Sequence, residues 1–449
     1  MNPIQNLIAM GLSWTTLIEL AILLLFYLIF CFWFFFLIFL GFLAYIGLKV
    51  YQYFQLQKLS TRTTIFNQDI PKEMRAAYYS NSWKRTIDFG DYLVPSNLKG
   101  DEVLIKVHSA SLNPSDFKFN FSRLPFYRWY KFPNLGIGKD FSGEIVKTGT
   151  LITKFRTGDL VYGFSTMGTL QEYTIAKEKW IHIIPDRIKF EEAAGLPLVG
   201  VTVYQALTYF FKNSEDNIYN EFEQETDLSG KNILVIGATG GCGHVAVQLA
   251  KFLNANEVYG VCSSAKVELI KNLQVCEEVF AYDSINFQKS MEDVLISEGE
   301  PKLDLILDTV SSPEAGDVGI QYTKFLKPEG KYVSLNSKSY LTFFLGLLVS
   351  FIPKLNFEKK GTHCHMLNRN DQRGLDVISK MASQGKMHFF TQLFGFNFQD
   401  IDNAIKLLKS RTVTGKLICN VINEYFIKII KFFIKNVHKN CRRNGKNKF

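Results

Sequence analysis

This 449-residue chain contains a glycine-rich turn between an apolar run and a helix, and the residue types of that turn could bind a phosphate group. In KNILVIGATGGCGHVAVQLA, the run ILVI has the composition of a strand buried on both faces. Read as [GA]-x-G-x-x-G, the pattern gives Ala238 the tight turn and Gly243 the close packing of helix on strand. Gly240, with Gly241 beside it, would let a pyrophosphate approach the helix N-terminus. Such turns also serve as plain connectors, so this one alone leaves both interpretations open.

The residues after the next apolar run bear on which dinucleotide would bind. NAD-specific folds carry an Asp or Glu there, about 20 residues past the glycines, to bind the ribose hydroxyls. In EVYGVCSSAK that position is Cys262, and Ser263, Ser264 and Lys266 follow it. Two hydroxyls and an ammonium, with no carboxylate to repel a 2′-phosphate, favour NADP(H). The alternative is that these residues begin the next helix, with Ser264 as its N-cap.

The cysteines and histidines do not predict a metal site. Seven cysteines are scattered without a CxxC pair, which is typical of reduced thiols facing a cytosol. His363 and His365 share a strand face around Cys364, but a zinc ion needs three or four ligands in tetrahedral reach. A structural pair is the favoured interpretation, and we expect no metal.

Two kinds of element must position these groups. Alternating strands with Gly and Pro turns occupy 71–198, and from about Val199 a strand–helix–strand rhythm predicts a doubly wound parallel sheet. After Asn336 the chain is expected to return to the first domain. The expected boundaries are 71–198 and 338–423 for the two parts of a β-rich domain and 199–337 for the parallel-sheet domain.

The N-terminal segment predicts a membrane anchor over 1–50, followed by a linker over 51–70. Ala21 to Leu48 carries no charge over 28 positions. One helix of that length would measure roughly 42 Å against a hydrocarbon core of about 30 Å, so it must tilt or bend into a hairpin. A signal peptide is the weaker alternative, because the basic start and the cleavage site are missing. The first cations follow the segment, so the body should face the cytosol; endoplasmic reticulum, lipid droplet and plasma membrane all stay open.

The basic charge belongs to the tail, 424–449. Eight cations and one anion give this tail +7 of the net +9, so the remainder is close to neutral and no nucleic-acid partner is inferred. The four lysines from Lys428 to Lys439 form one stripe beside apolar positions, which is typical of a helix on an anionic membrane surface. A helix packed on the body is the alternative. A third apolar run, 340–353, is too short to span a bilayer; it lines a cleft, forms a subunit contact or touches lipid.

The order of nine short motifs resembles a known family. They run from SASLNPSDFK, GIGKDFSGEIV and FRTGDLVYGF through GTLQEYTIA, EEAAGLPLVGVTVYQAL and GATGGCGHVAVQLA to LDLILDTV, LKPEGKYVSLN and TGKLI. From about residue 72 to 422 the chain is similar to the medium-chain dehydrogenase/reductase superfamily, in its zinc-free quinone-oxidoreductase-like (zeta-crystallin-like) branch. The resemblance implies an α/β fold in which a Rossmann NADP-binding domain joins a GroES-like catalytic domain. Zinc-dependent members carry a cysteine in the first motif and a His-Glu pair in the second; here the second reads Lys139-Asp140, and the four-cysteine lobe is missing.

The resemblance also implies a chemistry and a site. NADPH would lie between the domains and deliver hydride to a quinone or an activated alkene or carbonyl. Asn113 and Lys118 of NPSDFK, with Tyr127, would be the catalytic residues, and Thr202 would pass the nicotinamide. Asn113 also fits a turn-capping role before a proline, and Tyr127 also fits an aromatic wall. Asp116 is expected to orient its neighbours rather than titrate in catalysis.

Two functions follow from these observations. The first is a membrane-anchored NADPH-dependent reductase of small lipophilic substrates that shares a lipid layer with them. The second is a catalytically silent membrane scaffold or trafficking factor similar to the fungal Ast proteins, with a membrane-protein client, the plasma-membrane ATPase. By analogy with the family, a homodimer is expected.

Overall fold

The computed structural model describes most of the body of the chain. The chain divides into two compact units, Met1–Phe66 and Asn67–Phe449. The described residues are 70–79, 86–118, 135–208, 227–311, 318–335 and 372–422, together with the three helical positions Leu23, Tyr27 and Trp33. None of the helices in these ranges has the length and apolar character needed to cross a bilayer. Apart from those three positions, the predicted anchor, nearly all of the linker, the basic tail, Tyr127, the 340–353 run and the histidine pair at 363 and 365 lie outside the described residues.

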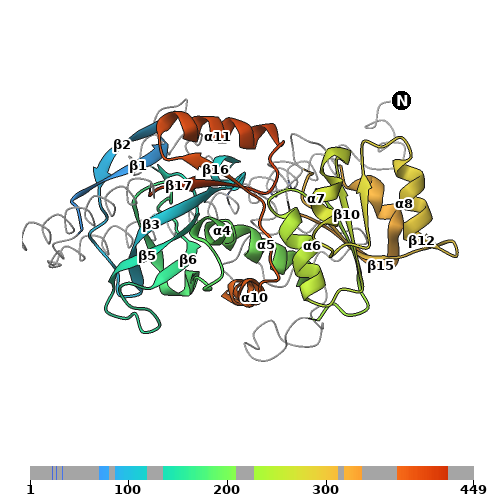
Figure 1. Ribbon diagram of the computed structural model, residues 1–449, viewed down its shortest axis with the longest axis horizontal. Helices are drawn as coiled ribbons and strands as arrows, with labels where there is room; N and C mark the ends of the chain where they lie inside the picture. Colours follow the sequence, from blue (N-terminus) through green and yellow to red (C-terminus); the bar gives the residue numbers. More distant parts are fainter. Residues whose placement is uncertain are drawn as a thin grey trace, which may run out of the picture. The chain divides into compact units, whose positions relative to one another are not determined.

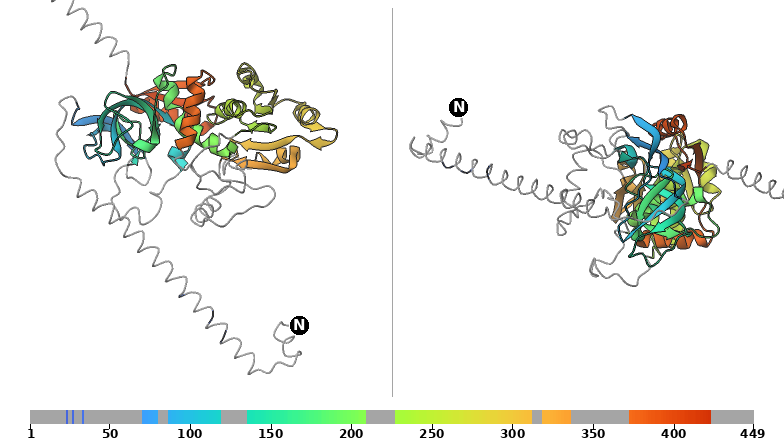
Figure 2. Two further views of the ribbon diagram at one scale, coloured as in Figure 1. Left: turned by 90° about the horizontal axis from the view of Figure 1, so that it is seen from below. Right: turned by 90° about the vertical axis from the view of Figure 1, so that its left-hand side faces the viewer.

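The largest sheet has seven strands and is mostly antiparallel (Figure 1). Its order is β16-β17-β3-β5-β6-β8, with β7 on β3, and a second sheet has the order β2-β1-β4. Figure 2 shows the blue-to-green strands curling around a common interior. The strands are β1 Glu73–Tyr79, β2 Ile87–Leu93, β3 Glu102–Leu112, β4 Leu135–Gly136, β5 Asp140–Thr148, β6 Leu160–Phe164, β7 Tyr173–Lys177, β8 Ile181–Ile183, β16 Thr391–Gly395 and β17 Lys416–Asn420.

The late strands β16 and β17 belong to this sheet although they come near the end of the chain. β17 pairs antiparallel with β3, so that Leu417 lies opposite Leu112 and Asn420 opposite Ser109. After the parallel sheet, the chain therefore returns to the first domain and adds β17 to its sheet.

A separate five-stranded sheet is parallel, with the order β11-β10-β9-β14-β15. All five residues of β9 are buried, as expected of a strand covered on both faces. The connection reverses at β9, because β10 lies on one side of it and β14 on the other, so the carboxyl end of β9 is a topological switch point. The strands are β9 Asn232–Ile236, β10 Glu257–Cys262, β11 Glu278–Ala281, β14 Leu303–Asp308 and β15 Leu326–Ser334, beside a small hairpin of β12 Ile296–Ser297 and β13 Glu300–Pro301.

Helices connect and cover the two sheets. α5 is apolar on nearly all sides and is largely buried, packed against α6 and α10. Asn397 caps the N-terminus of α11, because its side chain accepts a hydrogen bond from Asp400 N. Arg411 caps the C-terminus in the left-handed conformation. The helices are α3 Ser115–Lys118, α4 Phe190–Ala194, α5 Pro197–Thr208, α6 Gly243–Phe252, α7 Val267–Lys271, α8 Phe287–Leu295, α10 Gln372–Ser383 and α11 Phe398–Ser410, with 3₁₀ turns η3 Glu178–Trp180, η4 Ser264–Lys266 and η5 Ile320–Phe325.

The segment that leads from α10 to β16 is fixed to α6 by one side chain. The buried Gln248 amide donates to His388 O (3.0 Å) and accepts from His388 N (2.7 Å), as a neighbouring strand would do. The helix behind the glycine turn and the return segment are thus held together by two hydrogen bonds.

Candidate functional site

The glycine turn follows β9 and starts α6. Gly237 has a positive φ of 82°, so the tight turn is made one residue before Ala238, the position that the pattern had indicated. Ala238 itself is fully buried. A Cβ at Gly243 would lie 2.0 Å from Gly237 O, so this glycine has the close packing of helix on strand that the pattern predicts. A Cβ at Gly240 would meet only Gly237 O, at 3.3 Å, which leaves its surroundings open.

The start of α6 offers backbone donors. The amides of Cys242 and Gly243 donate to no backbone acceptor among the described residues, whereas His244 N already donates to Gly240 O and the bridge between Gly240 and Gly415 takes up Gly241 N. Free amides at the start of a ten-residue helix attract anions, and the open surroundings of Gly240 let one approach. The turn therefore fits the pyrophosphate of a dinucleotide.

A buried ionic cluster lies beside this turn. Lys416 Nζ donates to Asn113 Oδ1 (2.5 Å) and to Leu112 O (3.1 Å), and lies 3.8 Å from Asp140 Oδ2. Asn113 Nδ2 in turn donates to Asp140 Oδ2 at 2.8 Å. Three strands, β3, β5 and β17, bring these groups together from distant parts of the sequence.

Asp140 is the most enclosed charge of the cluster, with no exposed surface. Ser111 Oγ donates to Oδ2 (3.0 Å) and Leu198 N donates to Oδ1 (3.0 Å). Burial raises the pKa of Asp140, while Lys416 and these hydrogen bonds act in the opposite direction. Burial likewise lowers the pKa of Lys416, and the Asp140 carboxylate opposes that shift. Each charge is therefore retained in the interior because the other is present.

Backbone contacts join the cluster to the glycine turn. Gly415 N donates to Thr239 O at 2.8 Å, and Gly415 forms a parallel bridge with Gly240. A Cβ at Gly241 would lie 3.1 Å from Lys416 Cδ. Burial raises the pKa of the Cys242 thiol to about 11, and Lys416 opposes that shift. The glycine turn and the buried lysine are thus in direct contact.

His244, in the first turn of α6, is hydrogen-bonded to the glycine turn. Its Nδ1 lies 2.8 Å from Gly240 O, and its ring stacks on Phe390 at 5.3 Å between centroids. Burial lowers the pKa of His244 to about 4. The ring is therefore neutral at physiological pH and donates its Nδ1 proton to Gly240 O.

The predicted catalytic residues have different surroundings. Asn113 is 2% exposed and uses both its amide oxygen and its amide nitrogen within the cluster, so it holds its neighbours rather than presenting a face outward. Lys118 is the last residue of α3, but its side chain lies outside what the structure describes, as does Tyr127. Thr202 lies on α5 and is half-buried. Contact of Asn113, Lys118, Tyr127 and Thr202 with cofactor or substrate stays a prediction.

Asp116, also on α3, has a titration shifted into the physiological range. Its Oδ2 accepts from Asn113 N at 2.8 Å, and its buried Oδ1 has no hydrogen-bond partner among the described residues. Burial raises the pKa of Asp116 to about 7, although Lys139 opposes the shift. The sequence indicated an orienting role, and the bond to Asn113 fits that role, but the carboxyl also titrates near neutrality.

The segment expected to receive the adenosine ribose has a carboxylate that the sequence did not reveal. Ser263 and Ser264 follow β10, and Lys266 Nζ donates to Thr412 O at 3.0 Å. Ser264 N and Oγ donate to Asp283 at 2.7 and 3.0 Å. The expectation that no carboxylate faces this segment is therefore wrong, because Asp283 reaches it from the end of the neighbouring strand β11.

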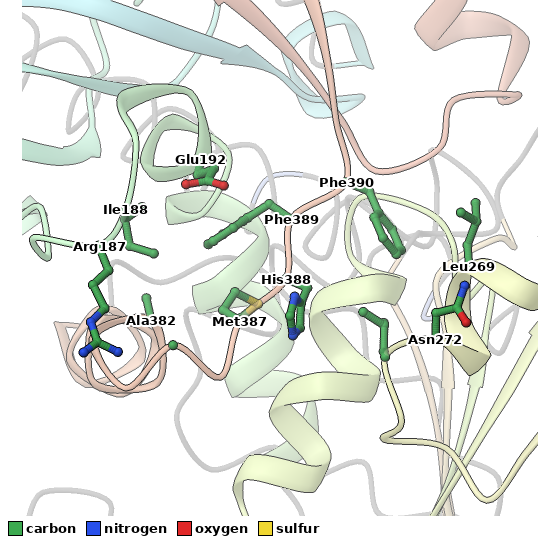
Figure 3. Close-up of a pocket in the computed structure, with 12 residues that line it drawn as sticks. Arg187, Ile188, Glu192, Leu269, Asn272, Ala382, Met387, His388, Phe389 and Phe390 are labelled. Carbon is green, nitrogen blue, oxygen red and sulfur yellow. The ribbon is translucent and has the colours of Figure 1, made fainter.

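A cavity of about 510 Å³ lies elsewhere, between α7, the end of α10 and the return segment (Figure 3). None of the predicted site residues lines it. Phe390 contributes a side chain to it, and the Phe390 carbonyl oxygen accepts a hydrogen bond from Lys416 N at 2.8 Å. The chemistry-bearing groups converge at the glycine turn and not in this cavity, so we place the candidate site at the turn. The lining residues are Arg187, Ile188, Glu192, Leu269, Asn272, Leu273, Ala382, Gly385, Met387, His388, Phe389 and Phe390.

Within the described ranges, no three His, Cys, Asp or Glu side chains are grouped so that they could hold a metal ion. At the second motif the side chains are Lys139, whose Nζ lies 3.5 Å from Ser115 Oγ, and the enclosed Asp140.

Comparison with known proteins gives a consistent picture. Residues 99–186 match the family described as alcohol dehydrogenase GroES-like domain, and residues 277–419 match zinc-binding dehydrogenase. The chain is 31% identical over 388 residues to 2-methylene-furan-3-one reductase of Solanum lycopersicum, covering 84% of this chain and 85% of that protein. It is 32% identical over 285 residues to the chloroplastic NADPH-dependent alkenal/one oxidoreductase of Arabidopsis thaliana, covering 59% of this chain and 63% of the relative.

Other similarities are shorter or structural. A chloroplastic quinone-oxidoreductase homolog of Spinacia oleracea is 39% identical over 189 residues, which is 41% of this chain and about half, 53%, of that relative. The quinone oxidoreductase from Coxiella burnetii superposes with a TM-score of 0.60 at 27% identity, covering 78% of this chain and 100% of that one. The chain therefore belongs to the medium-chain dehydrogenase/reductase superfamily of oxidoreductases and is similar to its quinone-oxidoreductase-like and enoyl-reductase members.

Proposed function

We propose that the chain is a zinc-independent, NADPH-dependent reductase of quinones or activated alkenes and carbonyls, held at a membrane by its N-terminal apolar segment. The observation that carries the proposal is the continuity between the open glycine turn and the buried Lys416–Asp140–Asn113 cluster. When bound, the nicotinamide cofactor supplies the hydride. Zinc independence is supported by the donor set at the second motif, where an ammonium and an enclosed carboxylate occupy the place of the family's His-Glu pair.

The residues of the chain have distinct tasks in this proposal. The amides of Cys242 and Gly243 hold the pyrophosphate, and Gly240 leaves room for it. Lys416 adds a cation next to the same turn while it neutralises Asp140. Negative charge that develops on the acceptor oxygen needs a hydrogen-bond donor. Because the Asn113 amide is occupied, we assign that donor role to Lys118, Tyr127 or water.

The predicted membrane segment fits the proposed substrates. Quinones and long enones partition into bilayers, so an anchor would concentrate enzyme and substrate in one layer. The uncharged stretch from Ala21 to Leu48 and the lysine stripe of the tail support this part of the proposal from sequence. NADPH is supported by Lys266 and Ser263 and by similarity to a relative named as NADPH-dependent.

The test is a titration of the full chain, in detergent micelles, with NADPH and NADH, followed by nicotinamide fluorescence. Gly240→Asp should fold, because its Cβ meets only Gly237 O at 3.3 Å, and its carboxylate should weaken NADPH binding by at least about tenfold. Gly90→Asp is the matched control, since a Cβ there has nothing within 4 Å and lies on β2. Micromolar NADPH binding that only Gly240→Asp loses, followed by turnover of quinones or enones, supports the reductase. Lack of binding by the native chain overturns it and favours the membrane scaffold.

A further inference from the structure

Asp283 is held against the first turn after β10 by two hydrogen bonds. Its Oδ1 accepts from Ser264 N at 2.7 Å, and its Oδ2 accepts from Ser264 Oγ at 3.0 Å. The same bonds lower the pKa of Asp283, so the carboxylate is ionised at neutral pH. Ser264 thus has both donors engaged, and the negative charge of Asp283 is fixed in place.

The topology brings this carboxylate to the end of the second strand of the parallel sheet. β10 and β11 are parallel neighbours, and Cys262 pairs with Ala281, so both strands end at the same level. Lys266 follows the same strand end, and its Nζ donates to Thr412 O at 3.0 Å. Burial raises the pKa of the Cys262 thiol to about 11. The charge of Asp283 also raises this pKa, whereas the charge of Lys266 lowers it. One fixed anion and one fixed cation therefore flank the end of β10.

We propose that Asp283 is a cofactor-specificity residue, supplied from β11, that lets the site accept NADH as well as NADPH. The proposal rests on the proposed function, because it concerns the ribose end of the same dinucleotide site. A carboxylate at the end of the second strand accepts hydrogen bonds from the ribose hydroxyls of NADH and repels a 2′-phosphate. Lys266 attracts that phosphate. With both charges present, the two effects offset each other and discrimination is weak.

The test uses the full chain in detergent micelles and two pairs of probes. NADPH and NADH are titrated by fluorescence, and adenosine 2′,5′-bisphosphate and AMP by calorimetry, because the second pair reports on the adenosine end alone. The variants are Asp283→Asn and Lys266→Met. Asp227→Asn is the matched control: this exposed carboxylate also accepts from a serine, Ser229, but it precedes β9 at the opposite end of the strands.

The native chain should prefer NADPH over NADH by no more than about tenfold. Asp283→Asn should tighten NADPH and the bisphosphate about five- to tenfold and weaken NADH, because one charge near a phosphate of charge about −2 is removed. Lys266→Met should weaken NADPH by a similar factor. Raising the salt concentration should shrink both effects, since Asp283 is exposed and Lys266 is only half-buried.

The outcomes separate the two proposals. If Asp283→Asn leaves the ratio of NADPH to NADH affinity within about twofold of the native ratio, as the Asp227→Asn control should, the specificity role is overturned while the reductase stands. A native preference of a thousandfold for either dinucleotide also overturns it. If the native chain binds neither dinucleotide nor the two adenosine probes, the proposed function fails and the specificity role fails with it.

Discussion

Two parts of the proposed site each contain a lysine and an aspartate, and the surroundings of the two differ. In the central cluster, Lys416 and Asp140 lie 3.8 Å apart with side chains 5% and 0% exposed. At the ribose end, Lys266 and Asp283 each bond to other groups and remain in contact with solvent. The central pair cannot lose one partner without leaving a charge in the interior, whereas either charge at the ribose end can be removed while water solvates the other.

This difference separates stability from recognition. A buried pair is tied to folding, because its charges exist only in the assembled sheet. Charges in contact with solvent can select a ligand, because their electric field reaches the ligand and their removal costs the fold little. The variants below test that separation.

The largest effect is expected from Lys416→Met. It removes the only lysine bonded to Asn113 within the described ranges and leaves the enclosed Asp140 carboxylate without its cation. The free energy of unfolding should fall by about 3–5 kcal/mol, measured by urea denaturation at pH 7. The double variant Asp140→Asn, Lys416→Met should regain more than half of that loss. A loss below about 1 kcal/mol for the single variant would show that the pair does not behave as a buried one.

The glycine turn separates packing from binding within four residues. Gly243→Ala should destabilise the fold by about 2–3 kcal/mol, because its Cβ would lie 2.0 Å from Gly237 O. Gly240→Ala should cost less, at most about 1 kcal/mol, because its Cβ would lie 3.3 Å from Gly237 O, and it should weaken NADPH binding instead. Thermal unfolding and the fluorescence titration measure the two quantities. Equal destabilisation by both alanines would contradict the assignment of separate tasks.

Asp116 has a buried carboxylate oxygen and no buried cation bonded to it among the described residues, so pH should reveal its cost. Its pKa of about 7 in the folded chain is above the ordinary value of 3.8, so between these values the folded state binds the extra proton. Stability is then full below about pH 4 and falls as pH rises through 7. Relative to the native chain, Asp116→Asn should gain about 2 kcal/mol at pH 8 compared with pH 5, by urea denaturation. A parallel pH profile for both proteins would refute the shift.

The smallest effect on stability is expected at the ribose end. Asp283→Asn should change the free energy of unfolding by no more than about 0.5 kcal/mol, since the carboxylate is exposed and an asparagine oxygen can still accept from Ser264. The measurement is the same urea titration as for Lys416→Met. A loss of several kcal/mol would mean that both ends of the site are structural and would remove the contrast between them.

Much of the fold could be read from local pattern. The runs NILVIG, EVYGVC and LDLILDTV are predicted as strands, because a strand covered on both faces is continuously apolar. They form β9, β10 and β14, although β9 ends at Ile236 and β14 at Asp308, short of the predicted ends. The helix expected over 265–273 is a 3₁₀ turn followed by a shorter helix, Val267–Lys271. Helix ends depend on capping and tertiary contacts, which periodicity does not encode.

The site was less readable, because its charged groups meet across the fold. The glycines were found because their spacing is local, although the tight turn is at Gly237 and not at Ala238. Lys416 and Asn113 are 303 residues apart in the sequence. Ser264 follows β10, whereas its partner Asp283 follows β11. One signal was available: in TGKLICN a lysine opens an otherwise apolar strand, and a lysine in such a place is buried only if it is paired.

The late position of β17 has a consequence for synthesis. β3 leaves the ribosome about 300 residues before the strand that covers it, since Lys416 bonds Leu112 O over a separation of 304 residues. Asp140 likewise leaves the ribosome long before the lysine that neutralises it. Until then the nascent sheet has an open edge at Ser109–Leu112 and a carboxylate without its cation. A chain that stops before residue 416 therefore cannot reach the native sheet, and it presents to chaperones and proteases an edge that the finished protein hides.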